Sequence, residues 1–240
     1  MPVLKVQTDV NVWIPVDGAP GETPPPSSSG AYISFPGTSG SYASVAQLTL
    51  PSVTHRFVWE MRRTTWTANE QKLTVTKWND SGPYGWWAAI NANGSAHFRY
   101  STQADPRAIV YVEGSAPSAL PPTDEFIELD QSFDGPTRTA QLSWRHVGGS
   151  EWTSFSRSPT GASVASILDS SAPFRIAASG AGNYRNLNAD VRQLTLYNDK
   201  GQSVFTLDPD VGADFADGSS WVSDSGHTVT LSGGATIKES

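Results

Sequence analysis

The sequence predicts an all-β protein in which two antiparallel sheets pack as a sandwich. Short stretches of alternating apolar and polar residues recur along the chain, and no segment shows a sustained helical period of apolar residues. Turn residues separate these stretches, and Asn93-Gly94 is the strongest hairpin signal among them. Many short strands joined by such turns are typical of a two-sheet sandwich.

About thirteen segments are expected to be strands, from the alternation rules for half-buried strands. In chain order they are 31–35, 46–50, 55–63, 72–78, 85–90, 96–100, 108–113, 125–131, 138–145, 174–178, 189–197, 203–208 and 228–231. Segment 55–63 shows the pattern well, since Phe57, Trp59 and Met61 occupy every second position. Segments 125–131 and 138–145 are predicted to pair as a long hairpin.

The hairpin formed by 85–90 and 96–100 carries the sharpest structural prediction. If Asn93 and Gly94 form a type I′ turn, Ala92 pairs with Ser95, and Ala89 then faces Phe98. The predicted core face holds Trp87, Ala89, Phe98 and Tyr100. The opposite face holds Trp86, Ala88, Ile90, His97 and Arg99. A tryptophan among polar groups on that second face would suit a flat, hydroxyl-rich ligand.

Composition excludes several classes of function. The 240 residues include no cysteine, which excludes disulfides, thiol chemistry and cysteine-based zinc sites. The net charge is −7 and Arg62-Arg63 is the only basic pair, which disfavours nucleic acid and anionic membranes as partners. The sequence shows no signal peptide and no apolar run of transmembrane length.

The chain divides into two parts by composition. Residues 1–29 are predicted to be an N-terminal arm that ends in a linker, because 18–30 is rich in Pro, Ser and Gly. Residues 30–240 are predicted to be one β domain. The alternative for 1–29 is a first strand and a long surface loop of that domain, although structureless loops of this length are uncommon in compact domains.

Four stretches resemble the concanavalin A-like, laminin-G-like jelly roll. They are 31–37 (AYISFPG) with 40–43, 57–62 (FVWEMR), 87–98 (WAAINANGSAHF) and 187–198 (LNADVRQLTLYN). Residues 205–210 (FTLDPD) and 219–237 (SSWVSDSGHTVTLSGGATI) are similar to the endings of minor tail and other virion proteins of tailed bacteriophages. Those proteins carry this jelly roll without signal peptides or cysteines.

This second resemblance implies a non-enzymatic structural or host-adhesion protein of a phage virion, on the tail or the capsid surface. The arm would anchor it to another virion protein by strand addition. Exposed loops would contact a host glycan, and self-association into a symmetric oligomer is expected. Two alternatives stay open: a free carbohydrate-binding module and a glycoside hydrolase.

Hydrolysis requires a pair of carboxylates, and the pattern is incomplete here. Glucanases of this fold carry Glu-x-Asp-x-x-Glu or Glu-x-Asp-x-Glu on one strand. Glu128 and Asp130 match the first half, but Ser132 and Phe133 stand where the second glutamate would be. The histidines occupy no recognisable nucleophile motif, and no Gly-x-Ser-x-Gly elbow occurs. No catalytic residue is therefore predicted.

Ligand binding is expected at aromatic and polar residues in or beside loops, where sugar stacking or a protein interface would use them. The predicted residues are Trp66, Trp78, Tyr84, Trp86, His97, Arg99, Trp152, Asn183, Tyr184 and Arg185. The structural alternative is that these tryptophans close the ends of the sandwich.

No cofactor is expected apart from a weak case for Ca²⁺. The candidate ligands are Asp208, Asp210, Asp214 and Asp217. Their spacing departs from the calcium-loop pattern, since Gly212 stands where a third ligand belongs. Aspartates in Gly-rich turns more often form caps and Asx-turns.

Overall fold

The computed structural model describes residues 30–50, 53–164, 166–179, 185–209, 219–223 and 225–239. All regular structure within these residues is β, and the part of the chain described contains no helix suited to crossing a membrane. The prediction of an all-β, two-sheet antiparallel jelly-roll sandwich is confirmed. The predicted arm and linker, 1–29, lie outside the described residues.

Sheet A contains eight strands in the order β10-β9-β8-β3-β12-β1-β16, with β13 also paired to β12. Its strands are β1 (Ala31–Pro36), β3 (His55–Arg62), β8 (Ile127–Asp134), β9 (Thr139–His146), β10 (Thr153–Arg157), β12 (Asn188–Tyr197), β13 (Ser203–Leu207) and β16 (Thr236–Glu239). The pairings among β12, β3, β8, β9 and β10 are antiparallel, so sequence neighbours β8 and β9 form the expected long hairpin.

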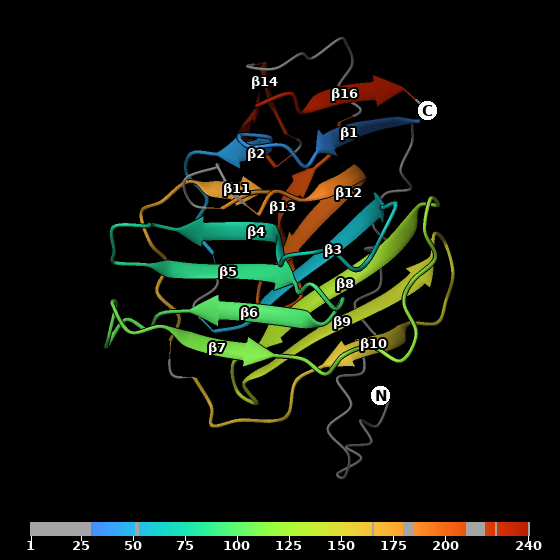
Figure 1. Cartoon of the computed structure of the whole chain (residues 1–240). Helices are drawn as coiled ribbons and strands as arrows, with labels where there is room; N and C mark the ends of the chain where they lie inside the picture. The colour runs from blue at the N-terminus through green and yellow to red at the C-terminus, as the bar shows by residue number, and fades with distance from the viewer. Residues whose placement is uncertain are drawn as a thin grey trace, which may run out of the picture.

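Sheet B contains eight strands in the order β14-β15-β2-β11-β4-β5-β6-β7. Its strands are β2 (Tyr42–Val45), β4 (Lys72–Trp78), β5 (Gly85–Ile90), β6 (Ala96–Tyr100), β7 (Val110–Glu113), β11 (Phe174–Ile176), β14 (Ser220–Val222) and β15 (Thr228–Ser232). Figure 1 shows β4 to β7 as one layer crossing over β3, β8 and β9 of the other layer.

Most predicted strands are present, and the differences lie at weak patterns. The segment 46–50 is not a strand; the strand precedes it as β2. Three further strands were not predicted: β10, β14 and β16. In β10 only Phe155 is apolar, so alternation alone could not reveal that strand.

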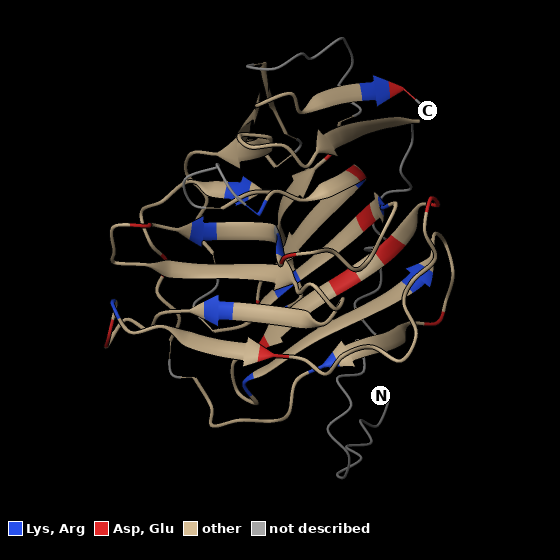
Figure 2. Cartoon of the chain, viewed as in Figure 1, with Lys and Arg blue, Asp and Glu red and all other residues tan. Residues whose placement is uncertain are grey.

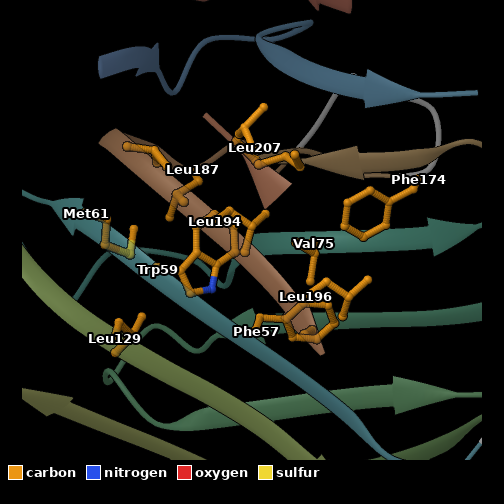
Figure 3. Packing of buried hydrophobic residues seen from close by; sticks show 14 of the residues in the cluster. Phe57, Trp59, Met61, Val75, Leu129, Phe174, Leu187, Leu194, Leu196 and Leu207 are labelled. Atoms are coloured by element: carbon orange, nitrogen blue, oxygen red, sulfur yellow. The ribbon is translucent and has the colours of Figure 1, made fainter. Parts of the chain in front are cut away.

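The core lies between the two sheets. Trp59, Leu129 and Leu194 point inward from sheet A and meet Val75 and Phe174 of sheet B, as Figure 3 shows. All five side chains have no exposed surface. Removal of this apolar surface from water is the main term that stabilises the sandwich.

The β5–β6 hairpin differs from the prediction in its turn. The Gly94 N–H donates to the Asn91 carbonyl at 2.9 Å, and the Asn91 N–H donates to the Ser95 carbonyl at 2.9 Å. Gly94 alone in this turn has a positive φ, of 84°. These bonds define a three-residue loop with a glycine bulge instead of a two-residue type I′ turn.

The longer turn shifts the pairing by one residue. Phe98 lies opposite Ala88, and His97 lies opposite Ala89. Because side chains alternate between faces, this shift exchanges the two faces of β5. The predicted core positions of Trp87 and Ala89 are therefore wrong: Trp86, Ala88 and Ile90 enter the main core, and Trp87 and Ala89 face outward. The inward placement of Phe98 and Tyr100 is confirmed.

Candidate functional site

Two of the predicted ligand-binding tryptophans are structural. Trp86 is fully buried between the sheets, where its ring lies 5.6 Å from that of Phe57. Trp66 is 2% exposed, and its indole N–H donates to the Pro122 carbonyl at 2.9 Å. The predicted exposure of both side chains is wrong. The register shift turned Trp86 inward, and the loop that contains Pro122 lies against Trp66.

Five predicted residues gather on the outer face of sheet B around Trp87. We call this the arginine–aromatic cluster, and it comprises Trp78, Tyr84, Trp87, His97, Arg99, Tyr111 and Arg185. The Arg99 guanidinium lies 4.6 Å from the ring of Trp78 and 4.8 Å from that of Trp87. The rings of Trp78 and Tyr84 stack at 4.8 Å with an interplanar angle of 6°.

The two tryptophans of the arginine–aromatic cluster have almost no surface open to a ligand. Trp78 and Trp87 are buried, and Tyr111 is exposed over 55% of its surface. Guanidiniums of Arg99 and Arg185 lie 4.8 Å and 5.2 Å from the Trp87 ring. Sugar stacking needs a free ring face, so these tryptophans act chiefly as packing.

His97 is buried within the arginine–aromatic cluster, and this burial changes its pKa. Burial, together with the charges of Arg99 and Arg185, lowers the pKa of His97 to about 4. The imidazole is therefore neutral at physiological pH. The ring packs edge-on against Tyr111 at 6.0 Å and serves as part of the wall of the cluster.

Trp152 lies apart from the others, on the outer side of sheet A just before β10. The Arg145 guanidinium lies 4.4 Å from its ring centroid, and the ring is partly exposed. It borders a pocket of about 120 Å³ in the outer face of sheet A. We call this the sheet A pocket; it is lined by Thr54, Arg56, Asp130, Ser132, Phe133, Asp134, Thr137, Thr139, Gln141, Ser143, Trp152 and Arg157.

Strand alternation and register build the floor of the sheet A pocket. Alternation sends every second residue of β8 and of β9 outward, and the register sets Ser132 beside Gln141 and Asp134 beside Thr139. On one side β3 brings Arg56 opposite Ser132. On the other side β10 brings Arg157 opposite Gln141. Four strands thus contribute hydroxyl, amide, carboxylate and guanidinium groups to one surface.

Asp130 is the most perturbed group in the pocket. The Arg56 Nε donates to its Oδ2 at 2.9 Å, while its Oδ1 is buried without a hydrogen-bond partner among the described residues. Burial raises the pKa of Asp130, and the charge of Arg56 opposes that rise. A carboxylate in a pocket with a perturbed pKa marks a candidate binding site.

The carboxylates of sheet A that could suggest hydrolysis are each held by an arginine. Glu128 accepts a hydrogen bond from Arg145 Nε, and Glu60 accepts one from Arg192 at 3.1 Å. The strand alternation that placed Glu128 and Asp130 on a polar outer face is confirmed.

The metal prediction stays largely untested. Among the described residues no group of His, Asp and Glu is placed to hold a metal ion. Asp208 follows β13, whereas Asp210, Asp214 and Asp217 lie outside the described residues. The predicted ligand residues Asn183 and Tyr184 also lie outside them.

Sequence reasoning found Trp152 but missed Arg56, Gln141 and Arg157. Polar residues at alternate positions of β8 and β9 were the available signal, because they mark one hydrophilic stripe on each strand. Only the tertiary structure brings β10 alongside β9 and so adds Arg157.

No protein-family model matches the chain, and no curated protein matches it either. Among solved structures, a proposed carbohydrate binding protein from Bacteroides ovatus aligns with a TM-score of 0.54 and 10% identity, over 88% of this chain and 60% of that one. Domains LG4-5 of the mouse laminin alpha1 chain align with a TM-score of 0.47 and 15% identity, over 85% and 52%. A heptameric SAP-like pentraxin from Limulus polyphemus aligns with a TM-score of 0.41 and 10% identity, over 70% and 76%.

At such low identity the Bacteroides likeness shows the fold and nothing of the ligand. This chain is a jelly-roll sandwich of the kind that the likeness to the concanavalin A-like and laminin-G-like fold predicted. The chain spans less than two thirds of the Bacteroides protein.

Proposed function

We propose that the domain binds carbohydrate and that the sheet A pocket is its site. The observation that carries this proposal is a partly exposed Trp152 beside a pocket floor of hydroxyl, amide and charged groups from four strands. An indole face packs against the C–H face of a sugar ring, while polar groups accept and donate the hydrogen bonds of its hydroxyls.

We propose binding without turnover. Ser132 and Phe133 stand where a second carboxylate of the glucanase pattern belongs, and Glu128 is engaged by Arg145. Turnover of a β-glucan that is lost in a Glu128→Gln variant would contradict this part of the proposal.

A glycan array followed by calorimetry tests the site. We expect Trp152→Ala to weaken binding of any glycan hit by roughly tenfold or more, as truncation of an aromatic anchor does. Trp152→Phe keeps a ring against Arg145 and should retain most of the affinity. Tyr111→Ala changes an exposed ring on sheet B and is the matched control. Weaker binding in Tyr111→Ala with unchanged binding in Trp152→Ala would contradict the sheet A site and place the site on sheet B.

The setting of this activity is also a proposal, supported by the resemblance to phage virion proteins. The domain would serve in adhesion or structure on a tail or capsid surface, with 1–29 as the anchor and a symmetric oligomer as the assembly. Deleting 1–29 should then abolish incorporation into the particle, measured by mass spectrometry of purified virions, while glycan affinity is unchanged. Loss of glycan binding with normal incorporation would contradict this division of roles.

A further inference from the structure

The strands of sheet A contain five arginines, and four of them are paired with carboxylates. Figure 2 shows the charged residues following one another across β3, β8, β9 and β12. The pairs are Arg56–Asp130 at 2.9 Å, Arg62–Asp190 at 2.6 Å, Arg192–Glu60 at 3.1 Å, and Arg145–Glu128. The fifth, Arg157, makes no ion pair or hydrogen bond through its guanidinium within the described residues, although it lines the sheet A pocket.

An unpaired arginine on a surface is ordinarily solvated. A binding role for Arg157 therefore has to be argued from where it lies. Arg157 is held by β10 directly opposite Gln141, on the wall of the pocket that also contains Trp152. A guanidinium is charged at every physiological pH and presents a fork of donors that matches a carboxylate. The other arginines of this face already use that fork on protein carboxylates.

The sheet A pocket also offers acceptors. Asp134 accepts a hydrogen bond from Thr137 Oγ1 at 2.6 Å, and it takes part in no ion pair among the residues described. Arg56 compensates Asp130. The pocket therefore presents one uncompensated cation, Arg157, opposite Gln141, and one uncompensated carboxylate, Asp134, near the β8–β9 turn. The net charge of −7 repels an anionic ligand in this pocket only weakly, because salt at physiological concentration screens charges that lie more than about 8 Å away.

We infer that the pocket selects a saccharide bearing a carboxylate, such as a uronic acid residue. The ligand carboxylate binds Arg157, the sugar ring packs on Trp152, and ring hydroxyls donate to Asp134. This inference rests on the proposed function and names the class of sugar that the same pocket takes. A neutral sugar would leave the Arg157 charge partly desolvated without an anionic partner.

Calorimetry on the full chain with four matched oligosaccharides tests the inference. They are an oligomer of glucuronic acid, the neutral glucose oligomer of the same linkage, the corresponding glucosamine oligomer and a sulfated glucose oligomer. We expect the glucuronate oligomer to bind about tenfold or more tightly than the neutral one, as a charge-assisted hydrogen bond implies. Arg157→Gln should abolish that preference, because it should weaken binding of the glucuronate oligomer about tenfold more than binding of the neutral oligomer. Arg62→Gln, in a pair outside the pocket, is the control and should preserve the preference.

The outcomes separate the inference from the proposed function. Equal affinity for acidic and neutral oligomers, unchanged in Arg157→Gln, would overturn the inference and leave sugar binding intact. Preference for the glucosamine oligomer would overturn the inference, because it would mean that the pocket selects a cationic sugar through Asp134. A sulfated glucose oligomer that binds as tightly as the glucuronate would overturn the assignment to a carboxylate. Absence of binding to every saccharide in both the array and the calorimetry would overturn the proposed function as well.

Discussion

The outer faces of the two sheets differ in what their arginines contact. On sheet B, Arg99 and Arg185 lie over the rings of the arginine–aromatic cluster. On sheet A, arginines pair with carboxylates of neighbouring strands and also lie over rings, as Arg145 does over Trp152. Trp78 and Trp87 are buried beneath these guanidiniums, whereas Trp152 keeps part of its ring exposed and lies beside the hydroxyl groups of the sheet A pocket. The more aromatic face is therefore packing, and the more polar face keeps the pocket.

The largest expected effect tests whether the arginine–aromatic cluster is structural. Trp87 is 1% exposed, and Trp87→Ala should lower the free energy of unfolding by about 3–5 kcal/mol, the usual range for deleting a buried large aromatic side chain. Urea denaturation followed by far-UV circular dichroism measures it. The folded fraction should keep its glycan affinity.

Tyr111→Ala is the matched control within the same cluster. Its ring is 55% exposed, so its truncation should cost about 1 kcal/mol or less. A comparable loss in both variants would mean that Tyr111 carries as much packing as Trp87, and the two sheets would then differ less than their burial indicates.

The second effect is a dependence of stability on pH that arises on sheet B. The pKa of His97 is lowered to about 4 in the folded state, against an ordinary value of 6.5. The unfolded state therefore binds the proton first. The free energy of unfolding should be highest above pH 6.5 and fall by roughly 3 kcal/mol as the pH drops to 4, at about 1.4 kcal/mol per pKa unit.

A His97→Gln variant separates the contribution of His97 to this pH dependence from that of other titrating groups. Burial and the charge of Lys77 together lower the pKa of His55 to about 3, so protonation of His55 weakens the fold in the same acidic range. Urea midpoints at pH 7 and pH 4.5 should differ less in His97→Gln than in the parent protein. An unchanged difference would show that His97 does not titrate as its burial requires.

The smallest effect is expected on sheet A. The Arg62 and Asp190 side chains are 34% and 22% exposed, so a double-mutant cycle with Arg62→Gln and Asp190→Asn should give a coupling of about 0.2–1 kcal/mol. The coupling should decrease with added salt. A coupling above 2 kcal/mol would make the ion-pair row of sheet A a structural element comparable to the cluster of sheet B.

Much of the fold could be predicted from alternation, and the errors have local causes. Strands β3 and β6 lie at or within one residue of their predicted bounds, because their apolar residues recur at every second position. The strand β10 was missed because Phe155 is its only apolar residue. The candidate site was predicted at Trp152 alone, since its other groups come from strands whose neighbours are set by sheet order.

The β5–β6 hairpin shows where sequence reasoning failed. Asn93-Gly94 indicated a turn correctly, but the sequence is compatible with both a two-residue and a three-residue loop. The choice moves Trp86 and Trp87 to opposite faces. Burial of Trp86 against Phe57 from sheet A is part of what distinguishes the two registers, and that contact joins residues far apart in the chain.

The sequence by itself determined the all-β class, most of the strands and the polar stripes of β8 and β9, because a period of two is a local property of neighbouring residues. Only the tertiary structure decided which stripe faces outward, which tryptophans are covered, and that β10 brings Arg157 beside Gln141. Alternation is the same for either face of a strand. Which face is buried therefore depends on packing between the sheets and on the order of strands within them.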